Sequence, residues 1–141
     1  PLNGADGIAG QIGYLPSLKG NDIIDKAAST AGLCRVGGES AEKLFERAAS
    51  GDGKAERAIE EWAKEVMNVV AFIIGFYNPP RIVIGGGISR QGQKLIDYLM
   101  REEAVLPVPY RNKTLVSTAR NSSGVIGAAK YALKKYGAGR G

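Results

Sequence analysis

The strongest chemical signal in the sequence is a glycine bend that follows directly on a short β-branched run. The run Arg81–Ile84 is read as a buried strand, and Gly85, Gly86, Gly87 and then Ser89 follow it. Glycines at the carboxyl end of a strand let the backbone approach a nucleotide where a Cβ would block it. A tight turn with positive φ explains the same glycines. The bend is neither a Walker loop, since no Gly-Lys-Ser/Thr follows, nor a Gly-x-Gly-x-x-Gly fingerprint.

The near absence of histidine and cysteine excludes several common enzyme chemistries. The 141 residues contain no His and one Cys, Cys34. Ser-His-Asp and Cys-His catalysis, an internal disulfide and the usual zinc sites are therefore excluded. Cys34 lies beside Arg35 but has neither a histidine base nor a second thiol, so no catalytic role is expected for it.

Charge is unevenly distributed along the chain. The net charge is +5, and residues 104–141 carry seven basic and no acidic side chains. No basic run with interleaved aromatics occurs, so direct DNA binding is not predicted. Lys134 and Lys135 stand where a helix C-terminus favours cations. The composition, with 44% hydrophobic and 23% charged residues, is typical of a globular domain. We expect a cytoplasmic protein without a membrane partner, because the longest uncharged apolar stretch, 66–77, is too short to span a bilayer.

The elements that must position the bend alternate between helix and strand. In the first half, the sequence predicts a glycine-rich loop entering a strand at Gln11–Leu15, a helix at Asp22–Thr30 closed by Gly32, and a helix at Ala41–Ala49 capped by Ser40. A long helix at Lys54–Tyr77, capped by Asp52, and the strand Arg81–Ile84 come next. The last predicted elements are a helix capped by Ser89 and ending near Glu103, a strand at Thr114–Ala119, and a helix at Val125–Tyr136 capped by Ser122 or Ser123. This order, with short connections, predicts an α/β fold with parallel strands and right-handed crossovers.

The long helix is predicted to be the spine of the core. Its apolar residues recur at intervals of three and four, and its charges stop after Glu65. From Val66 onward nearly every face is apolar, so the helix should begin at the surface and end buried. Trp62 is interpreted as a core residue. The small residues Gly124–Ala129 favour close packing of the last helix against a strand.

Three segments in the right order resemble the ROK family (repressors, open reading frames, sugar kinases). Gly4–Tyr14 is similar to its glycine-rich segment, which usually ends Ala-Gly-Glu/Asp-Ile-Gly-His. Asn78–Ser89 resembles its Asn-Pro-x-x-Ile-Val-Ile-Gly-Gly strand, and Ser123–Ala129 its closing Gly-x-x-Gly-Ala-Ala helix. The resemblance implies that residues 1–141 are the C-terminal lobe of an actin-like ATPase (ribonuclease H-like) fold, a short, mostly parallel sheet packed by helices. The N-terminal lobe and any DNA-binding domain are expected to lie outside this chain, which lacks a starting Met.

The resemblance also implies a ligand site. Gly85, Gly86, Gly87 and Ser89 would contact the adenosine of a nucleotide. Gln11 stands where the family has a Glu that binds a sugar hydroxyl, and Tyr14 where it has a zinc-ligating, sugar-contacting His. The family's cysteine-rich loop is absent here, so zinc is not expected.

No catalytic residue is assigned within the chain. The family's phosphate loop and catalytic Asp belong to the N-terminal lobe, so this chain by itself should not be a kinase. ATP and Mg²⁺ are expected only for a full-length kinase.

Three functions remain open at this point. The segment Gly4–Gly10 is more similar in sequence to the family's NagC-like transcriptional regulators. This similarity favours a sugar-sensing lobe that binds a small sugar or sugar phosphate. Such a regulator would bind DNA through a winged helix-turn-helix outside this chain. The alternative is the C-terminal half of an ATP-dependent, glucokinase-like sugar kinase. The third hypothesis is a ligand-free α/β protein that dimerises through its long apolar helix. An isolated lobe exposes the face that its partner would cover, so a homodimer is expected.

Overall fold

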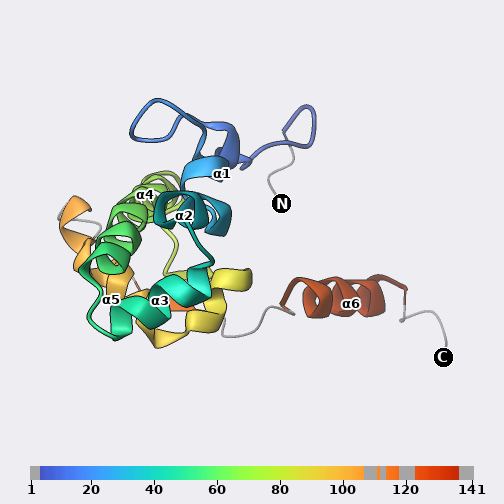
Figure 1. Ribbon diagram of the computed structural model, residues 1–141. Coiled ribbons are helices and arrows are strands. Elements are labelled where there is room, and N and C mark those ends of the chain that lie inside the picture. The colour runs from blue at the N-terminus through green and yellow to red at the C-terminus, as the bar shows by residue number, and fades with distance from the viewer. Residues whose placement is uncertain (1–3, 107–110, 112–113, 118–122, 137–141) are drawn as a thin grey trace.

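The computed structural model describes residues 4–106, 111, 114–117 and 123–136, and shows helices gathered around one long helix (Figure 1). Its elements are the short 3-10 helices η1 (Ile12–Tyr14), η2 (Gly87–Gln91) and η3 (Glu103–Val105), the helices α1 (Ile24–Ala27), α2 (Thr30–Gly37), α3 (Ala41–Ala49), α4 (Gly53–Tyr77), α5 (Gln93–Arg101) and α6 (Ser123–Tyr136), and the strands β1 (Arg81–Ile84) and β2 (Thr114–Ser117). The strands pair in parallel, with Ile82 opposite Leu115. The predicted α/β pattern with parallel strands is confirmed for these two strands.

Helix α4 is the spine of the fold, as predicted. It begins where the Asp52 carboxylate accepts hydrogen bonds from the backbone N–H of Lys54 (2.8 Å) and Ala55 (3.4 Å), which satisfies donors that the first turn leaves free. It ends at Asn78, whose φ of 40° is left-handed, and Pro79 follows. Proline cannot continue a helix, so the chain turns here into β1.

The core lies between α4 and the helices α2, α3 and α5. Its apolar side chains that are exposed by 1% or less are Leu33, Leu44, Ile59, Ala63, Met67, Ile74, Leu95 and Leu99. Trp62 is 3% exposed, and its indole N–H donates to the carbonyl of Ser29 at 2.9 Å. The interpretation of Trp62 as a core residue is confirmed, and its bond also ties α4 to the start of α2.

The amino-terminal prediction was wrong in two places. In place of the strand predicted at residues 11–15, Ile12–Tyr14 form the 3-10 helix η1, because the positive φ of Gly4, Gly7 and Gly10 keeps the preceding chain turning. A single antiparallel bridge, Pro16 to Ile23, follows among the described residues. The predicted helix at 22–30 is split, because the Ser29 hydroxyl accepts a hydrogen bond from the N–H of Gly32 (3.2 Å) and starts α2.

The helix predicted from Ser89 to near Glu103 is confirmed over Gln93–Arg101, but its predicted start and cap were wrong. Ser89 lies inside η2 and caps no helix, and Gly92, at a φ of 57°, separates η2 from α5. Helix α5 then ends at Arg101. Strand β2 ends at Ser117, and the remainder of that prediction, residues 118 and 119, lies outside the described residues, as does Ser122.

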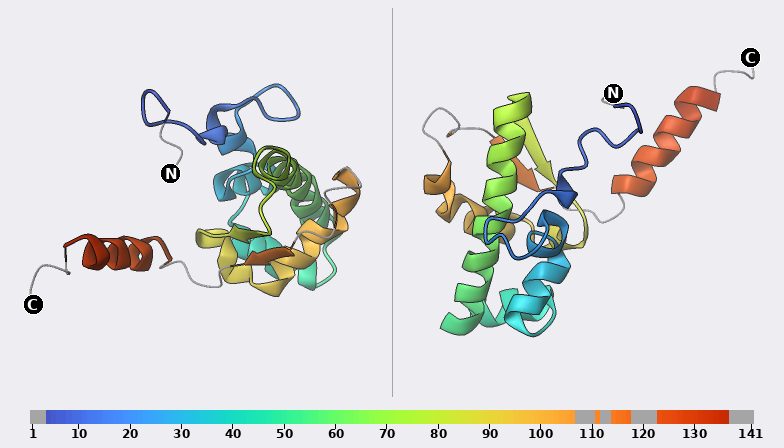
Figure 2. Two further views of the ribbon diagram at one scale, coloured as in Figure 1. Left: turned by 180° about the vertical axis from the view of Figure 1, so that it is seen from behind. Right: turned by 90° about the horizontal axis from the view of Figure 1, so that it is seen from above.

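Two faces that the sequence predicted to be packed are open. The inner face of α4 is buried at Val70 and Ile74, but Phe72 is 43% and Phe76 75% exposed. In α6 a Cβ on Gly127 would meet no described atom within 4 Å, so the described residues show no close packing on a strand at this glycine. Figure 2 shows α6 standing apart from the helices around α4. Among the described helices, none is both long and apolar enough to cross a membrane.

Candidate functional site

The glycine bend after β1 is a rigid turn with open space above it. Gly86 has a φ of +84°, and a Cβ on either Gly86 or Gly87 would meet nothing within 4 Å. Because β1 and β2 are parallel, their carboxyl ends lie at one edge of the sheet, and the bend stands at that edge. Ligands of open α/β sheets bind outside the carboxyl ends of the strands. The bend therefore lies at the edge where ligands of such sheets bind, and the space that a Cβ on Gly86 or Gly87 would enter is open.

Ser89 holds this bend from below. Its hydroxyl donates to the carbonyl oxygen of Gly86 at 2.7 Å, and its backbone N–H donates to the same oxygen at 3.1 Å. The residue is fully buried. Its hydroxyl therefore stabilises the conformation of the bend. The sequence analysis did not predict this role.

Gln11 faces a shallow cavity at the end of α4. The cavity has a volume of about 250 Å³ and lies between the glycine-rich segment and the last turn of α4; it is lined by Ile8, Gly10, Gln11, Ile12, Leu15, Phe76 and Tyr77. An amide that can both donate and accept, beside aromatic rings, suits a polyhydroxylated ligand. Tyr14 does not line this cavity, and it is 76% exposed. The fold therefore separates the two predicted sugar contacts.

A carboxylate that the sequence analysis did not single out lies beside the same segment. Asp25 belongs to the first turn of α1, and a Cβ on Gly13 would come within 3.3 Å of the Cβ of Asp25. The sequence places Asp22 and Asp25 three residues apart. Only the folded structure shows that, of these two residues, Asp25 packs against η1.

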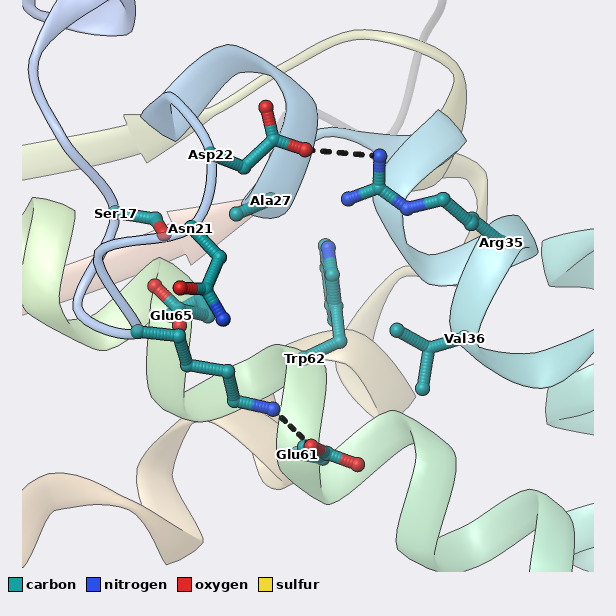
Figure 3. Close-up of a pocket in the computed structure, with 10 residues that line it drawn as sticks. Ser17, Asn21, Asp22, Ala27, Arg35, Val36, Glu61, Trp62 and Glu65 are labelled. Atoms are coloured by element: carbon teal, nitrogen blue, oxygen red, sulfur yellow. Dashed lines mark hydrogen bonds and ion pairs between the residues drawn. The ribbon is translucent and has the colours of Figure 1, made fainter.

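A second, more enclosed pocket lies between residues 17–22, α2 and α4 (Figure 3). Its volume is about 160 Å³, and its lining is Ser17, Lys19, Asn21, Asp22, Ala27, Arg35, Val36, Glu61, Trp62 and Glu65. Glu65 is 8% exposed, and its Oε2 accepts a hydrogen bond from the N–H of Leu18 at 3.2 Å. Two ion pairs join residues of this lining, Lys19 with Glu61 and Arg35 with Asp22, and Figure 3 shows the second of them. The sequence feature that could have indicated this pocket is the acidic pair Glu61 and Glu65, which lie one helical turn apart and beside Trp62.

The electrostatics of this pocket favour binding over catalysis. The N–H of Ile23 donates to the Asp22 carboxylate and lowers its pKa, and the charges of Lys26 and Arg35 act in the same direction against the opposing effect of burial. Asp22 is therefore ionised at neutral pH. The chain has no histidine to act as a base here. Within the described ranges, no group of three or more His, Cys, Asp or Glu side chains is arranged to hold a metal ion.

The predicted nucleotide and sugar residues rest on different parts of the scaffold. Helix η1, which follows Gln11, packs against α1, whereas η2, which carries Gly87 and Ser89, packs against α3 and α5. A ligand that touches both would have to bridge these two regions.

The sequence matches the profile of the ROK family over residues 1–135. It is 34% identical over 99 residues to a polyphosphate glucokinase of Mycobacterium tuberculosis (strain ATCC 25618 / H37Rv), a match that covers 70% of this chain and 33% of that protein. It is 27% identical over 158 residues to a glucokinase of Halalkalibacterium halodurans, which covers 89% of this chain and 48% of that protein.

The fold matches that of a ROK family glucokinase from Streptomyces griseus whose crystal structure contains glucose and AMPPNP. The TM-score is 0.79 at 18% sequence identity, and the match covers 91% of this chain and 52% of that one. The predicted fold class, part of an actin-like ATPase, is confirmed. The chain spans between one third and about half of the length of these relatives.

Proposed function

The chain belongs to the ROK family, and from this premise we propose that it forms the carboxyl-terminal half of a sugar kinase. The observation that carries the proposal is the open glycine bend at Gly86 and Gly87, at the carboxyl edge of the parallel strands. A sensor that binds only a sugar does not require a bend of this kind. The sugar kinases among the relatives support the same choice.

The bend suits a nucleotide because Ser89 holds the Gly86 carbonyl in place and a Cβ on Gly86 or Gly87 would meet no described atom within 4 Å. Gly85, Gly86 and Gly87 would lie against the nucleotide, and Ser89 would act as a positioning residue through its bond to Gly86. Bound ATP with Mg²⁺ supplies the phosphoryl group and the charge that stabilises its transfer. We place the protein in the cytoplasm, where ATP is available.

Gln11 is the group proposed to recognise the sugar, because it lines the cavity. Its amide donates to one hydroxyl and accepts from another. The exposed rings of Phe76 and Tyr77 offer an apolar surface to the carbon face of a hexose. Tyr14 is proposed to contact the sugar only when a second lobe closes over it, since it stands in solvent here.

The opposing wall, the general base and the phosphate loop must come from an amino-terminal lobe. Phosphoryl transfer depends on positioning and charge stabilisation, which one wall of a cleft does not supply. We therefore propose that the chain acts only when joined to that lobe.

Calorimetric titration of the two-lobed protein with glucose and with N-acetylmannosamine tests the site. Replacing Gln11 by Leu keeps the size of the side chain and removes its polar atoms, so it should weaken sugar binding by about 10-fold or more. Gln93→Leu is the matched control: it removes an exposed amide bonded to Asp97 in α5 and should leave sugar binding unchanged. Unaltered affinity in Gln11→Leu would remove Gln11 from the site.

A sugar-sensing regulator is the second candidate function, and the sequence similarity of the segment Gly4–Gly10 to such regulators favours it. It would bind sugar through the same Gln11 cavity and transfer no phosphoryl group. A titration that detects sugar binding but no effect of ATP on it would favour the sensor.

A further inference from the structure

The enclosed pocket between residues 17–22, α2 and α4 is lined by polar atoms for which the described fold supplies no partner. Ser17 is 6% and Glu65 8% exposed, and both line the pocket. The N–H of Leu18 donates to Glu65 Oε2, but within the described part of the chain neither Glu65 Oε1 nor the Ser17 hydroxyl is hydrogen-bonded. No fully sealed side-chain N or O atom of the described residues lacks a partner. These two atoms therefore open onto the pocket, where an occupant must satisfy them.

The charges of the lining leave a negative excess at Glu65. Lys19 forms an ion pair with Glu61. Arg35 forms an ion pair with Asp22, at 3.0 Å. Among the described residues, no Lys or Arg forms an ion pair with the carboxylate of Glu65. A buried carboxylate is costly without a positive partner, so the pocket favours a cation over an anion.

The indole of Trp62 is a second feature of the lining that favours a cation. Its N–H already donates to the carbonyl of Ser29 at 2.9 Å, so the ring presents its face and edge to the pocket and no free donor. Figure 3 shows the ring nearly edge-on, with Ser17, Asn21 and Glu65 on one side of it. Among aromatic side chains, tryptophan attracts cations most strongly over its face. The ring and the carboxylate thus favour the same class of ligand.

The volume of the pocket limits the ligand to a small organic molecule. It is about 160 Å³, and a cavity of about 150 Å³ holds one molecule of benzene. A hexose has about twice as many non-hydrogen atoms as benzene, so it is too large for this space. A bare metal ion would leave most of the space empty, and within the described ranges no group of three or more His, Cys, Asp or Glu could hold one.

We propose that this pocket binds a small primary amine in its protonated form, with a short apolar chain. An ammonium group has three N–H donors and no acceptor. Glu65 Oε1, the Ser17 hydroxyl oxygen and the side-chain carbonyl of Asn21 are the acceptors that would receive these donors. The apolar chain of the amine would lie against Trp62 and Ala27, which also line the pocket.

The bound amine would join residues 17–22 to the long helix. Ser17 belongs to this segment and Glu65 to α4, and the antiparallel bridge between Pro16 and Ile23 closes the base of the segment. A ligand that binds only the folded chain stabilises it by mass action. The inference does not depend on kinase activity, because the lining of this pocket shares no residue with the glycine bend or the Gln11 cavity.

Fluorescence titration of the 141-residue chain tests the proposal, because Trp62 is its only tryptophan. The ligand is n-butylamine, which is protonated at neutral pH as a lysine side chain is. The comparison compounds are 1-butanol, which is similar in size and uncharged, and KCl, whose cation has no N–H. We expect n-butylamine to bind with a Kd of about 1 mM or lower. It should bind at least about 10-fold more tightly than either comparison compound.

Calorimetric titration of the two-lobed protein repeats the measurement with the amino-terminal lobe present. Glu65→Gln keeps an oxygen that can accept from the Leu18 N–H and removes the negative charge, so it should weaken n-butylamine binding at least about 10-fold. Ser17→Ala removes a hydroxyl that bonds to no described residue, so it should weaken binding about 3-fold or more and leave the fold intact. Glu42→Gln is the matched control: it changes an exposed carboxylate of α3 outside the pocket and should leave binding unchanged.

Circular dichroism of each variant separates loss of folding from loss of binding. If Glu65→Gln fails to fold, Ser17→Ala alone decides the result. A folded variant of either kind that binds n-butylamine as tightly as the wild type would overturn the proposal. So would equal affinity for 1-butanol or for K⁺, because the pocket would then not recognise a charged N–H donor. If about 20 mM n-butylamine produces neither heat nor a change in fluorescence, water is the occupant of the pocket and the proposal is wrong.

Discussion

Removing the Ser89 hydroxyl tests whether the bend it holds is a nucleotide contact. The hydroxyl donates to the Gly86 carbonyl at 2.7 Å from a fully buried position. A hydrogen bond of this kind contributes about 1 kcal/mol net to stability. Ser89→Ala should therefore lower the free energy of unfolding by about 1 kcal/mol. The remaining bond from the Ser89 N–H still reaches the Gly86 carbonyl, so the bend should loosen and not collapse.

The same free energy fixes the expected effect on nucleotide binding. If the bond biases the bend toward its binding-competent shape by about 1 kcal/mol, its loss reduces ATP affinity by up to about 5-fold. Urea unfolding gives the stability, and calorimetric titration of the two-lobed protein with ATP and Mg²⁺ gives the affinity.

Ser40→Ala supplies the matched control. Ser40 caps α3, where its hydroxyl accepts a hydrogen bond from the N–H of Lys43 at 3.4 Å, and loss of such a cap costs about 1 kcal/mol. This variant should lose similar stability and keep its full affinity for ATP. If Ser89→Ala loses stability and binds ATP as the wild type does, the bend is a structural turn and the reasoning is refuted.

Two further predictions concern the scaffold. Gly32→Ala should destabilise the fold by about 1–3 kcal/mol. Alanine favours helix, but its Cβ would lie 2.3 Å from the Ala27 carbonyl oxygen. Gly53→Ala is the control: its Cβ would meet only the end of the Arg57 side chain at 3.4 Å, so it should be neutral or slightly stabilising in the same urea titration. Hydrogen bonds from Arg47 and from the N–H groups of Lys54 and Ala55 lower the pKa of Asp52 in the folded state, so its stabilising contribution is complete above the pKa of the unfolded chain and is lost as the pH falls through the folded value. The wild type should therefore lose more unfolding free energy between pH 6 and about pH 3 than Asp52→Asn does. An equal loss in the two proteins would show that Asp52 does not contribute to the destabilisation at low pH.

The elements that are encoded locally were predictable from the sequence. Ser40 and Asp52 cap α3 and α4 as predicted, because a cap depends on residues within one turn. Proline after Asn78 fixed the end of α4 in the same local way. The strand Arg81–Ile84 also has the predicted bounds, but the prediction that it is buried was wrong, since only Ile82 is buried and Val83 is 53% exposed.

Features that depend on distant contacts were not predictable. The strand predicted at residues 11–15 has no partner strand in the described fold, and η1 forms there in its place. Ser89 has the residue type of a helix cap, yet its hydroxyl is used on the Gly86 carbonyl. The pocket around Glu65 draws on residues from 17 to 65, and its existence depends on how α2 and residues 17–22 pack on α4. Asp25 beside η1 was missed for the same reason.

Phosphoryl transfer to a sugar is the most direct test of the central claim, that this chain is one half of a sugar kinase. Phosphorus-31 NMR would follow the two-lobed protein with glucose or N-acetylmannosamine, using ATP with Mg²⁺ in one arm and inorganic polyphosphate in the other. We predict that a sugar phosphate accumulates with at least one donor, and that the 141-residue chain alone forms none. A two-lobed protein that binds the sugar and ATP but forms no sugar phosphate with either donor would contradict the account.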